Sequence, residues 1–141
     1  MCSVHGKSVL VVENDAAMLR ALSKVLSAEG AVISRASWTG EAVEYWAKKQ
    51  ARFDLVITDL AWPGPGGSMI LNALKAVFPE VPVMIITASG NPGLQTQCLR
   101  QGAAAFLEKP VDTVELLTAI EHALSSRRGE ARFPVQRTDE A

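Results

Sequence analysis

Residues 55–59 read Leu-Val-Ile-Thr-Asp, a short apolar run that ends in a hydroxyl and a carboxylate. Three other runs share its continuous rather than alternating hydrophobicity, at residues 9–12, 83–86 and, more weakly, 103–107. Continuous apolar runs of this length are typical of strands that are buried on both faces. A fifth run, residues 31–36, is more polar, which favours a position at the edge of a sheet.

Segments with helical spacing separate these runs, with apolar stripes in residues 19–26, 42–47 and 114–124. Gly30 marks the end of the first helix, and Pro92 suits the first turn of another. Pro110 lets a final helix begin near Asp112. Alternating strands and helices imply parallel βα units with right-handed crossovers. The sequence therefore predicts a three-layer α/β sandwich.

The composition fits one globular domain: 141 residues, 48% hydrophobic, with 14 Lys+Arg against 15 Asp+Glu and a net charge of -1. This near-neutral charge gives no reason to expect nucleic acid as a partner. No apolar run approaches the roughly 18 residues that a membrane span needs, and Cys2 and Cys98 form neither a disulfide framework nor a metal cluster. We expect a cytoplasmic protein without a direct nucleic-acid or membrane partner.

Polar residues follow the apolar runs, and in a parallel sheet all of them would gather at the carboxyl edge, where ligands bind. They are Glu13-Asn14-Asp15, Thr58-Asp59, Thr87 and Glu108-Lys109-Pro110. Close carboxylates repel each other unless a hard cation such as Mg²⁺ bridges them. An ionised aspartate needs no general base to attack phosphorus, and an ammonium and a hydroxyl can neutralise the transferring group. The pattern therefore predicts phosphoryl transfer with Asp59 as both metal ligand and nucleophile.

Several motifs stand in a specific order and spacing, namely Asp59-Leu60-Ala61-Trp62-Pro63-Gly64 with Gly67 beyond it, Thr87-Ala88, and Gly102-Ala103 leading through Phe106 to Lys109-Pro110. At these residues the chain resembles the receiver domain of two-component response regulators. The resemblance covers about residues 7–125. Residues 126–141 lack a helical stripe, and we interpret them as a C-terminal tail or linker stub.

The resemblance implies a doubly wound, five-stranded sheet of flavodoxin-like order 2-1-3-4-5. It implies that a histidine kinase or phosphotransfer protein phosphorylates Asp59. It also implies a Mg²⁺ ion, held by the side chains of Glu13, Asn14 and Asp59 and by the backbone carbonyl of Ala61. The domain would be a signalling module that catalyses only its own phosphorylation and dephosphorylation, not an enzyme.

The same resemblance implies a conformational switch. Lys109 would contact the phosphoryl group, while Thr87 and Phe106 would be the switch pair, with the Thr87 hydroxyl moving inward and Phe106 filling the space it leaves. A downstream protein, an effector domain or a second copy of the chain would then dock on an altered surface. That surface comprises the helix after Pro92, the strand at residues 103–107 and the final helix.

One position departs from the family pattern, because Asn14 stands where receivers usually carry a second acid. An amide oxygen can bind Mg²⁺ but brings no charge, and one charge near 4 Å is worth on the order of a few kcal/mol at a protein surface. We therefore predict weaker Mg²⁺ binding and slower phosphorylation than in a fully acidic site. A Mg²⁺ titration followed by Trp62 fluorescence, with Trp38 and Trp46 changed to Phe, tests this: a sub-millimolar affinity that is unchanged in Asn14→Asp would contradict it.

Other interpretations remain open. The chain could be a degenerate receiver that acts as a phosphorylation-independent interaction module, which Asn14 favours. A small phosphohydrolase with an aspartyl nucleophile is disfavoured, because it would want a second acid where Ala61 stands. Residue by residue, Asn14 or Asp15 could cap the first helix, and Phe106 could be plain core packing.

Overall fold

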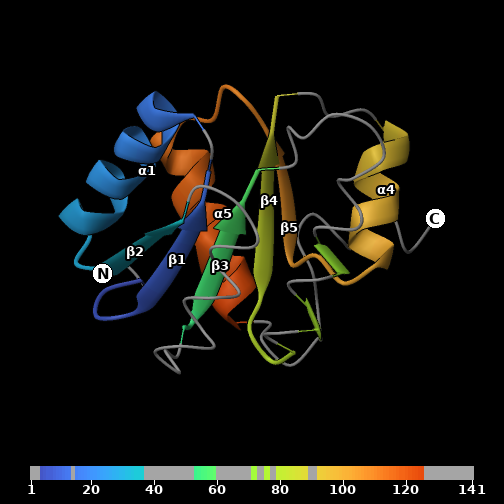
Figure 1. The fold of residues 1–141 in the computed structure, drawn as a ribbon, viewed down its shortest axis with the longest axis horizontal. Helices are drawn as coiled ribbons and strands as arrows, with labels where there is room; N and C mark the ends of the chain where they lie inside the picture. The colour runs from blue at the N-terminus through green and yellow to red at the C-terminus, as the bar shows by residue number, and fades with distance from the viewer. Residues whose placement is uncertain are drawn as a thin grey trace.

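The computed structural model describes residues 4–13, 15–36, 53–59, 71–72, 75–76, 79–88 and 92–125. Within them, five parallel strands form one sheet of order β2-β1-β3-β4-β5 (Figure 1). The strands are β1 (Ser8–Val12), β2 (Val32–Ala36), β3 (Leu55–Thr58), β4 (Val83–Thr87) and β5 (Ala105–Glu108). The predicted strand order and the edge position of β2 are confirmed. The last strand starts two residues later than the apolar run at 103–107 and takes in Glu108.

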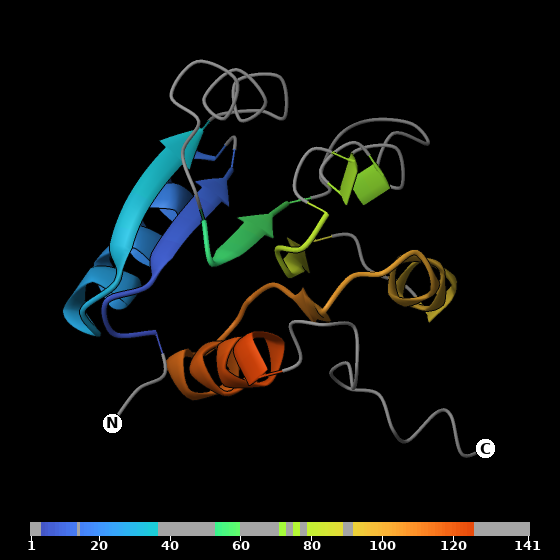
Figure 2. The same ribbon diagram turned by 90° about the horizontal axis from the view of Figure 1, so that it is seen from below.

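In the part of the chain that the structure describes, three helices flank this sheet: α1 (Ala16–Ala28), α4 (Pro92–Arg100) and α5 (Thr113–Ser125). Figure 2 shows α1 and α5 against one face and α4 against the other, which confirms the predicted three-layer, doubly wound architecture. No helix in the described ranges is long and apolar enough to cross a membrane. The helix predicted around residues 42–47 and the tail at 126–141 lie outside the described residues.

The core has two halves because the strands β1, β3, β4 and β5 bury residues on both faces. In β1, Val9 and Val11 pack with α1 and α5, whereas Leu10 and Val12 pack on the α4 side. All four are at most 1% exposed. Each such side chain contributes about 1.5–3 kcal/mol of hydrophobic free energy relative to exposure. This two-sided burial explains why the runs are continuous rather than alternating.

The helix ends follow local chemistry. Asp15 adopts an extended backbone conformation and caps α1, and α4 begins at Pro92. Asp112 accepts the Glu115 N–H through Oδ1 at 2.7 Å at the start of α5. Gly30, just beyond α1, has a φ of 89°, where a side chain would be strained and would overlap the His5 ring.

The register of the strands aligns their carboxyl ends. Val12 at the end of β1 lies opposite Thr58 at the end of β3. In the same way, Thr87 at the end of β4 lies opposite Glu108 at the end of β5. The residues that directly follow these strands therefore lie along one edge. This placement brings Glu13, Asp59 and Lys109 together despite their separation in sequence.

Candidate functional site

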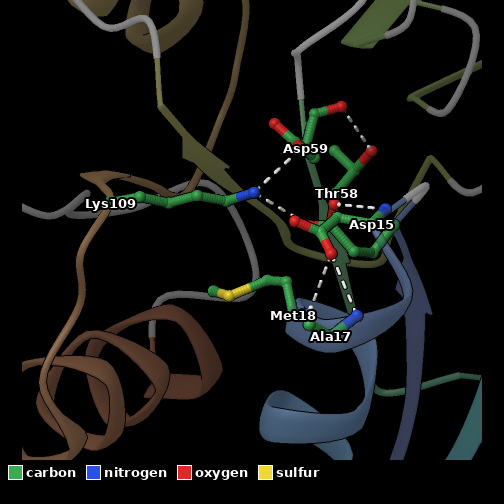
Figure 3. A network of polar contacts seen from close by, with 7 residues as sticks. Asp15, Ala17, Met18, Thr58, Asp59 and Lys109 are labelled. Atoms are coloured by element: carbon green, nitrogen blue, oxygen red, sulfur yellow. Dashed lines mark hydrogen bonds and ion pairs between the residues drawn. The ribbon is translucent and has the colours of Figure 1, made fainter.

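Three charged side chains meet at the carboxyl edge of the sheet. The Lys109 ammonium lies 3.0 Å from Asp59 Oδ2 and 3.4 Å from Glu13 Oε1. Figure 3 shows the extended lysine side chain reaching across to Asp59 from the β5 side. The Glu13 and Asp59 side chains are 2% and 7% exposed, and that of Lys109 is 18% exposed. The arrangement is a nearly buried pair of acids that shares one partly accessible cation.

Backbone hydrogen bonds extend the sheet by one residue and so fix the backbone positions from which these side chains project. The Glu13 N–H donates to the Ala36 carbonyl at 3.0 Å, and the Asp59 N–H donates to the Val12 carbonyl at 3.2 Å. The Lys109 N–H donates to the carbonyl of Thr87 at 2.9 Å. Each functional group therefore projects from the last rigid position of a strand rather than from the middle of a loop.

The Glu13 carboxylate is held at both oxygens. Oε2 accepts the backbone N–H of Asp15 at 3.0 Å, and Oε1 faces Lys109. The Asp15 side chain turns the other way and caps α1 through the N–H groups of Ala17 and Met18. Of the two predicted cap residues, Asp15 is confirmed, while Asn14 lies outside the described residues. The bond from Asp15 to Glu13 was not foreseen, although an acid two positions before a helix cap is a usable signal.

The electrostatics of the site reflect two acids and one base. Burial raises the pKa of Glu13 above its ordinary 4.5, the Asp15 N–H opposes this, and the neighbouring Asp59 carboxyl adds to it. For Lys109, burial alone would lower the pKa, but the hydrogen bond to Asp59 and the charges of both acids outweigh it and raise the pKa. The site therefore carries surplus negative charge and favours an additional cation.

The donor set fits a hard divalent cation. Glu13 and Asp59, which directly follow β1 and β3, are two of the predicted Mg²⁺ ligands and supply the carboxylate oxygens that Mg²⁺ prefers. The described ranges hold no group of three or more His, Cys, Asp or Glu residues that could bind a metal. The other two predicted ligands, Asn14 and the Ala61 carbonyl, lie outside those ranges.

The predicted switch pair lies on neighbouring strands. Thr87 is fully buried at the end of β4, and Phe106 of β5 is 6% exposed with Ile85 as its partner in the ladder. Phe106 belongs to the core half on the α4 side, together with Cys98 of α4. This burial agrees with plain core packing, and the role in switching stays a prediction. Trp62 and residues 63–67, which belong to the motif that follows Asp59, lie outside the described residues.

The charged cluster does not include four further polar side chains, those of His5, Thr58, Cys98 and His122. His5 and His122 are exposed, and Cys98 is a buried, free thiol. Thr58, directly before Asp59, is 1% exposed and donates from Oγ1 to the Asp59 carbonyl at 3.4 Å. None of these groups adds a charge at the carboxyl edge.

Comparison with known proteins gives one consistent family. The family model of the response regulator receiver domain matches residues 9–121 of this chain. The response regulator protein FleR of Pseudomonas aeruginosa is 34% identical over 122 residues, which are 86% of this chain and 25% of FleR. The crystal structure of a response regulator receiver domain protein from Clostridium thermocellum is 27% identical with a TM-score of 0.76, over 86% of this chain and 97% of that one.

A further solved relative is the beryllofluoride-activated NtrC4 receiver domain dimer, 28% identical with a TM-score of 0.76, over 85% of this chain and 98% of that one. The chain spans only about a quarter to a third of the curated relatives that it matches. The family match runs from the first strand into the last helix and includes all three charged residues of the site. The chain therefore belongs to the receiver domains of two-component signal transduction, which are signalling modules rather than enzymes.

Proposed function

We propose that Asp59 accepts a phosphoryl group from a histidine kinase or phosphotransfer protein, with Mg²⁺ at the site, and that phosphorylation changes a protein-interaction surface. The observation that carries this proposal is the 3.0 Å contact between the Lys109 ammonium and the nearly buried Asp59 carboxylate, beside a second acid. Receiver domains work with histidine kinases and effector domains, and they typically use Mg²⁺. The surplus negative charge of this site is consistent with that requirement.

The chemistry follows from the charges. An ionised Asp59 oxygen attacks the phosphorus of a phosphohistidine, so that a P–O bond forms while the P–N bond breaks. The imidazole leaves with the electron pair of that bond and takes a proton from solvent. Lys109, already next to Asp59, is placed to pair with an oxygen of the incoming group. A bound Mg²⁺ ion, held by Glu13, Asn14, Asp59 and the Ala61 carbonyl, would supply further charge neutralisation.

The readout would follow from the placement of Thr87 and Phe106. A phosphoryl group on Asp59 offers new acceptor oxygens at the edge where Thr87 ends β4, and we propose that its hydroxyl moves toward them. Phe106, one strand further along the sheet, would fill the space and alter the surface of α4, β5 and α5. A downstream protein, an effector domain or a second copy would dock there, and the dimer of the NtrC4 receiver domain supports the last of these.

The proposal is tested by incubating the protein with acetyl phosphate and Mg²⁺ and measuring its intact mass. We expect the gain of one phosphoryl group in the wild-type protein and none in Asp59→Ala. Asp54→Asn is the matched control, because Asp54 is an acid at the amino ends of the strands, away from the carboxyl edge. It should gain the phosphoryl group as the wild-type protein does.

The second candidate is a degenerate receiver that acts as an interaction module without phosphorylation. Asn14, which removes one charge from the predicted metal ligands, is the observation that favours it. No mass gain with any phosphodonor, at Mg²⁺ concentrations that saturate other receivers, would support this candidate against the first.

A further inference from the structure

We infer that Asp15 is a positioning residue for the metal site: by capping α1, it holds its own backbone N–H on Glu13 and so fixes the direction of that carboxylate. The inference rests on the proposed function, because it takes Glu13 to be a metal ligand. It adds a residue that contacts neither Asp59 nor Lys109 in any hydrogen bond or ion pair found among the described residues.

Asp15 is anchored at several points. Its Oδ1 accepts the N–H of Ala17 at 2.9 Å and that of Met18 at 3.4 Å. Its carbonyl accepts the Leu19 N–H at 2.9 Å. The remaining backbone group, the N–H, donates to Glu13 Oε2 at 3.0 Å. The first turn of α1 therefore fixes the donor that orients Glu13. Figure 3 shows Asp15 beside Ala17 and Met18 in that turn.

Glu13 needs an orienting hydrogen bond of this kind more than an aspartate at the same position would. Glutamate has one more rotatable bond than aspartate, and ordering a long side chain carries an entropic cost. With Oε2 bound to the Asp15 N–H, the other oxygen is left facing Lys109 and the carboxylate of Asp59. A capping side chain that keeps this geometry in the metal-free protein reduces the ordering that metal binding would otherwise require.

Hydrogen-bond partners of metal ligands commonly change metal affinity by 10–100-fold when they are removed. The loss of a helix cap also lowers the stability of the whole domain, so the two effects must be separated. The chain offers a matched control in Ala21, an exposed residue in the same helix. Ala21→Gly weakens α1 by an amount similar to the loss of an N-cap but leaves the Asp15 N–H in place.

The experiment measures Mn²⁺ binding to the full chain by the EPR signal of the free ion, with Mg²⁺ as competitor, and urea unfolding in EDTA. Mn²⁺ shares the preference of Mg²⁺ for oxygen ligands. We expect Asp15→Ala to bind about tenfold more weakly than the wild-type protein. Ala21→Gly should bind within about twofold of the wild-type protein despite a comparable shift in the urea midpoint. Asp15→Asn should also bind within about twofold, because asparagine caps equally well.

Three results would overturn the inference. The first is wild-type Mn²⁺ affinity in Asp15→Ala, and the second is a loss of affinity in Ala21→Gly as large as that in Asp15→Ala. The third is an equally large loss in Asp15→Asn, which would assign the effect to the charge of Asp15 rather than to its capping. Should Asp15→Ala not fold, Asp15→Gly replaces it, because glycine at an N-cap costs only a few tenths of a kcal/mol. It should bind as weakly as expected for Asp15→Ala, and wild-type affinity would contradict the inference. A wild-type protein that binds neither ion would overturn the metal site itself, whereas the other results concern only Asp15.

Discussion

The two edges of the sheet use acids in different ways. At the amino edge, Asp54 Oδ2 accepts the Ser8 N–H at 2.9 Å and the Asp54 N–H donates to the Ser8 carbonyl at 2.7 Å, so this acid completes the pairing of β1 and β3. At the carboxyl edge, Glu13 and Asp59 are nearly buried around one lysine. Folding explains the first arrangement but not the second, because apolar residues commonly replace buried ion pairs without loss of stability. The acids of the carboxyl edge therefore point to function.

The variant expected to have the largest effect on stability is Lys109→Ala. It leaves two nearly buried carboxylates without their shared cation, and we expect the free energy of unfolding at neutral pH without divalent ions to fall by about 3 kcal/mol. Urea denaturation measures the change. Added Mg²⁺ should restore part of the loss, because a ligand that binds only the folded state stabilises it.

The control for this variant is Lys24→Ala, at an exposed position of α1. It should change the free energy of unfolding by no more than about 0.5 kcal/mol. Equal losses in the two variants would show that the lysine at the carboxyl edge is an ordinary surface cation.

A second test compares the same substitution at the two edges. Asp59→Asn removes one of two acids that compete for Lys109, and we expect it to stabilise the metal-free protein by about 1 kcal/mol at neutral pH. Asp54→Asn weakens a charge-assisted bond to the Ser8 N–H, and we expect a loss of about 1 kcal/mol. Chemical denaturation in EDTA measures both. Changes of the same sign would remove the distinction between the edges.

Much of this organisation was predictable from the sequence. The two-sided burial of strands such as residues 9–12 and 83–86 leaves a continuous apolar run, and the parallel sheet then dictates that Glu13, Asp59 and Lys109 share an edge. The distribution of hydrogen bonds was not predictable. That Glu13 would accept the Asp15 N–H depends on the turn between β1 and α1, whose geometry no periodic pattern records.

The smallest expected effect is on the pH dependence of stability. The pKa of Glu13 is raised above 4.5 by burial and by the Asp59 carboxyl, so the folded state holds this proton more tightly than the unfolded state. The contribution of Glu13 to the free energy of unfolding therefore falls as pH rises from 4.5 through the raised pKa. Glu13→Gln lacks this proton. Its stability relative to the wild-type protein should rise across that interval and level off above it.

Urea midpoints measured in EDTA at a series of pH values give this difference directly. The raised pKa of Lys109 does not interfere, because its contribution is complete below 10.5 and is lost only as pH rises above that value. A difference that falls with pH would mean that the folded state prefers the charged form of Glu13. The charge of Lys109 would then outweigh burial and the Asp59 carboxyl in setting the pKa of Glu13, contrary to the raised pKa of this group.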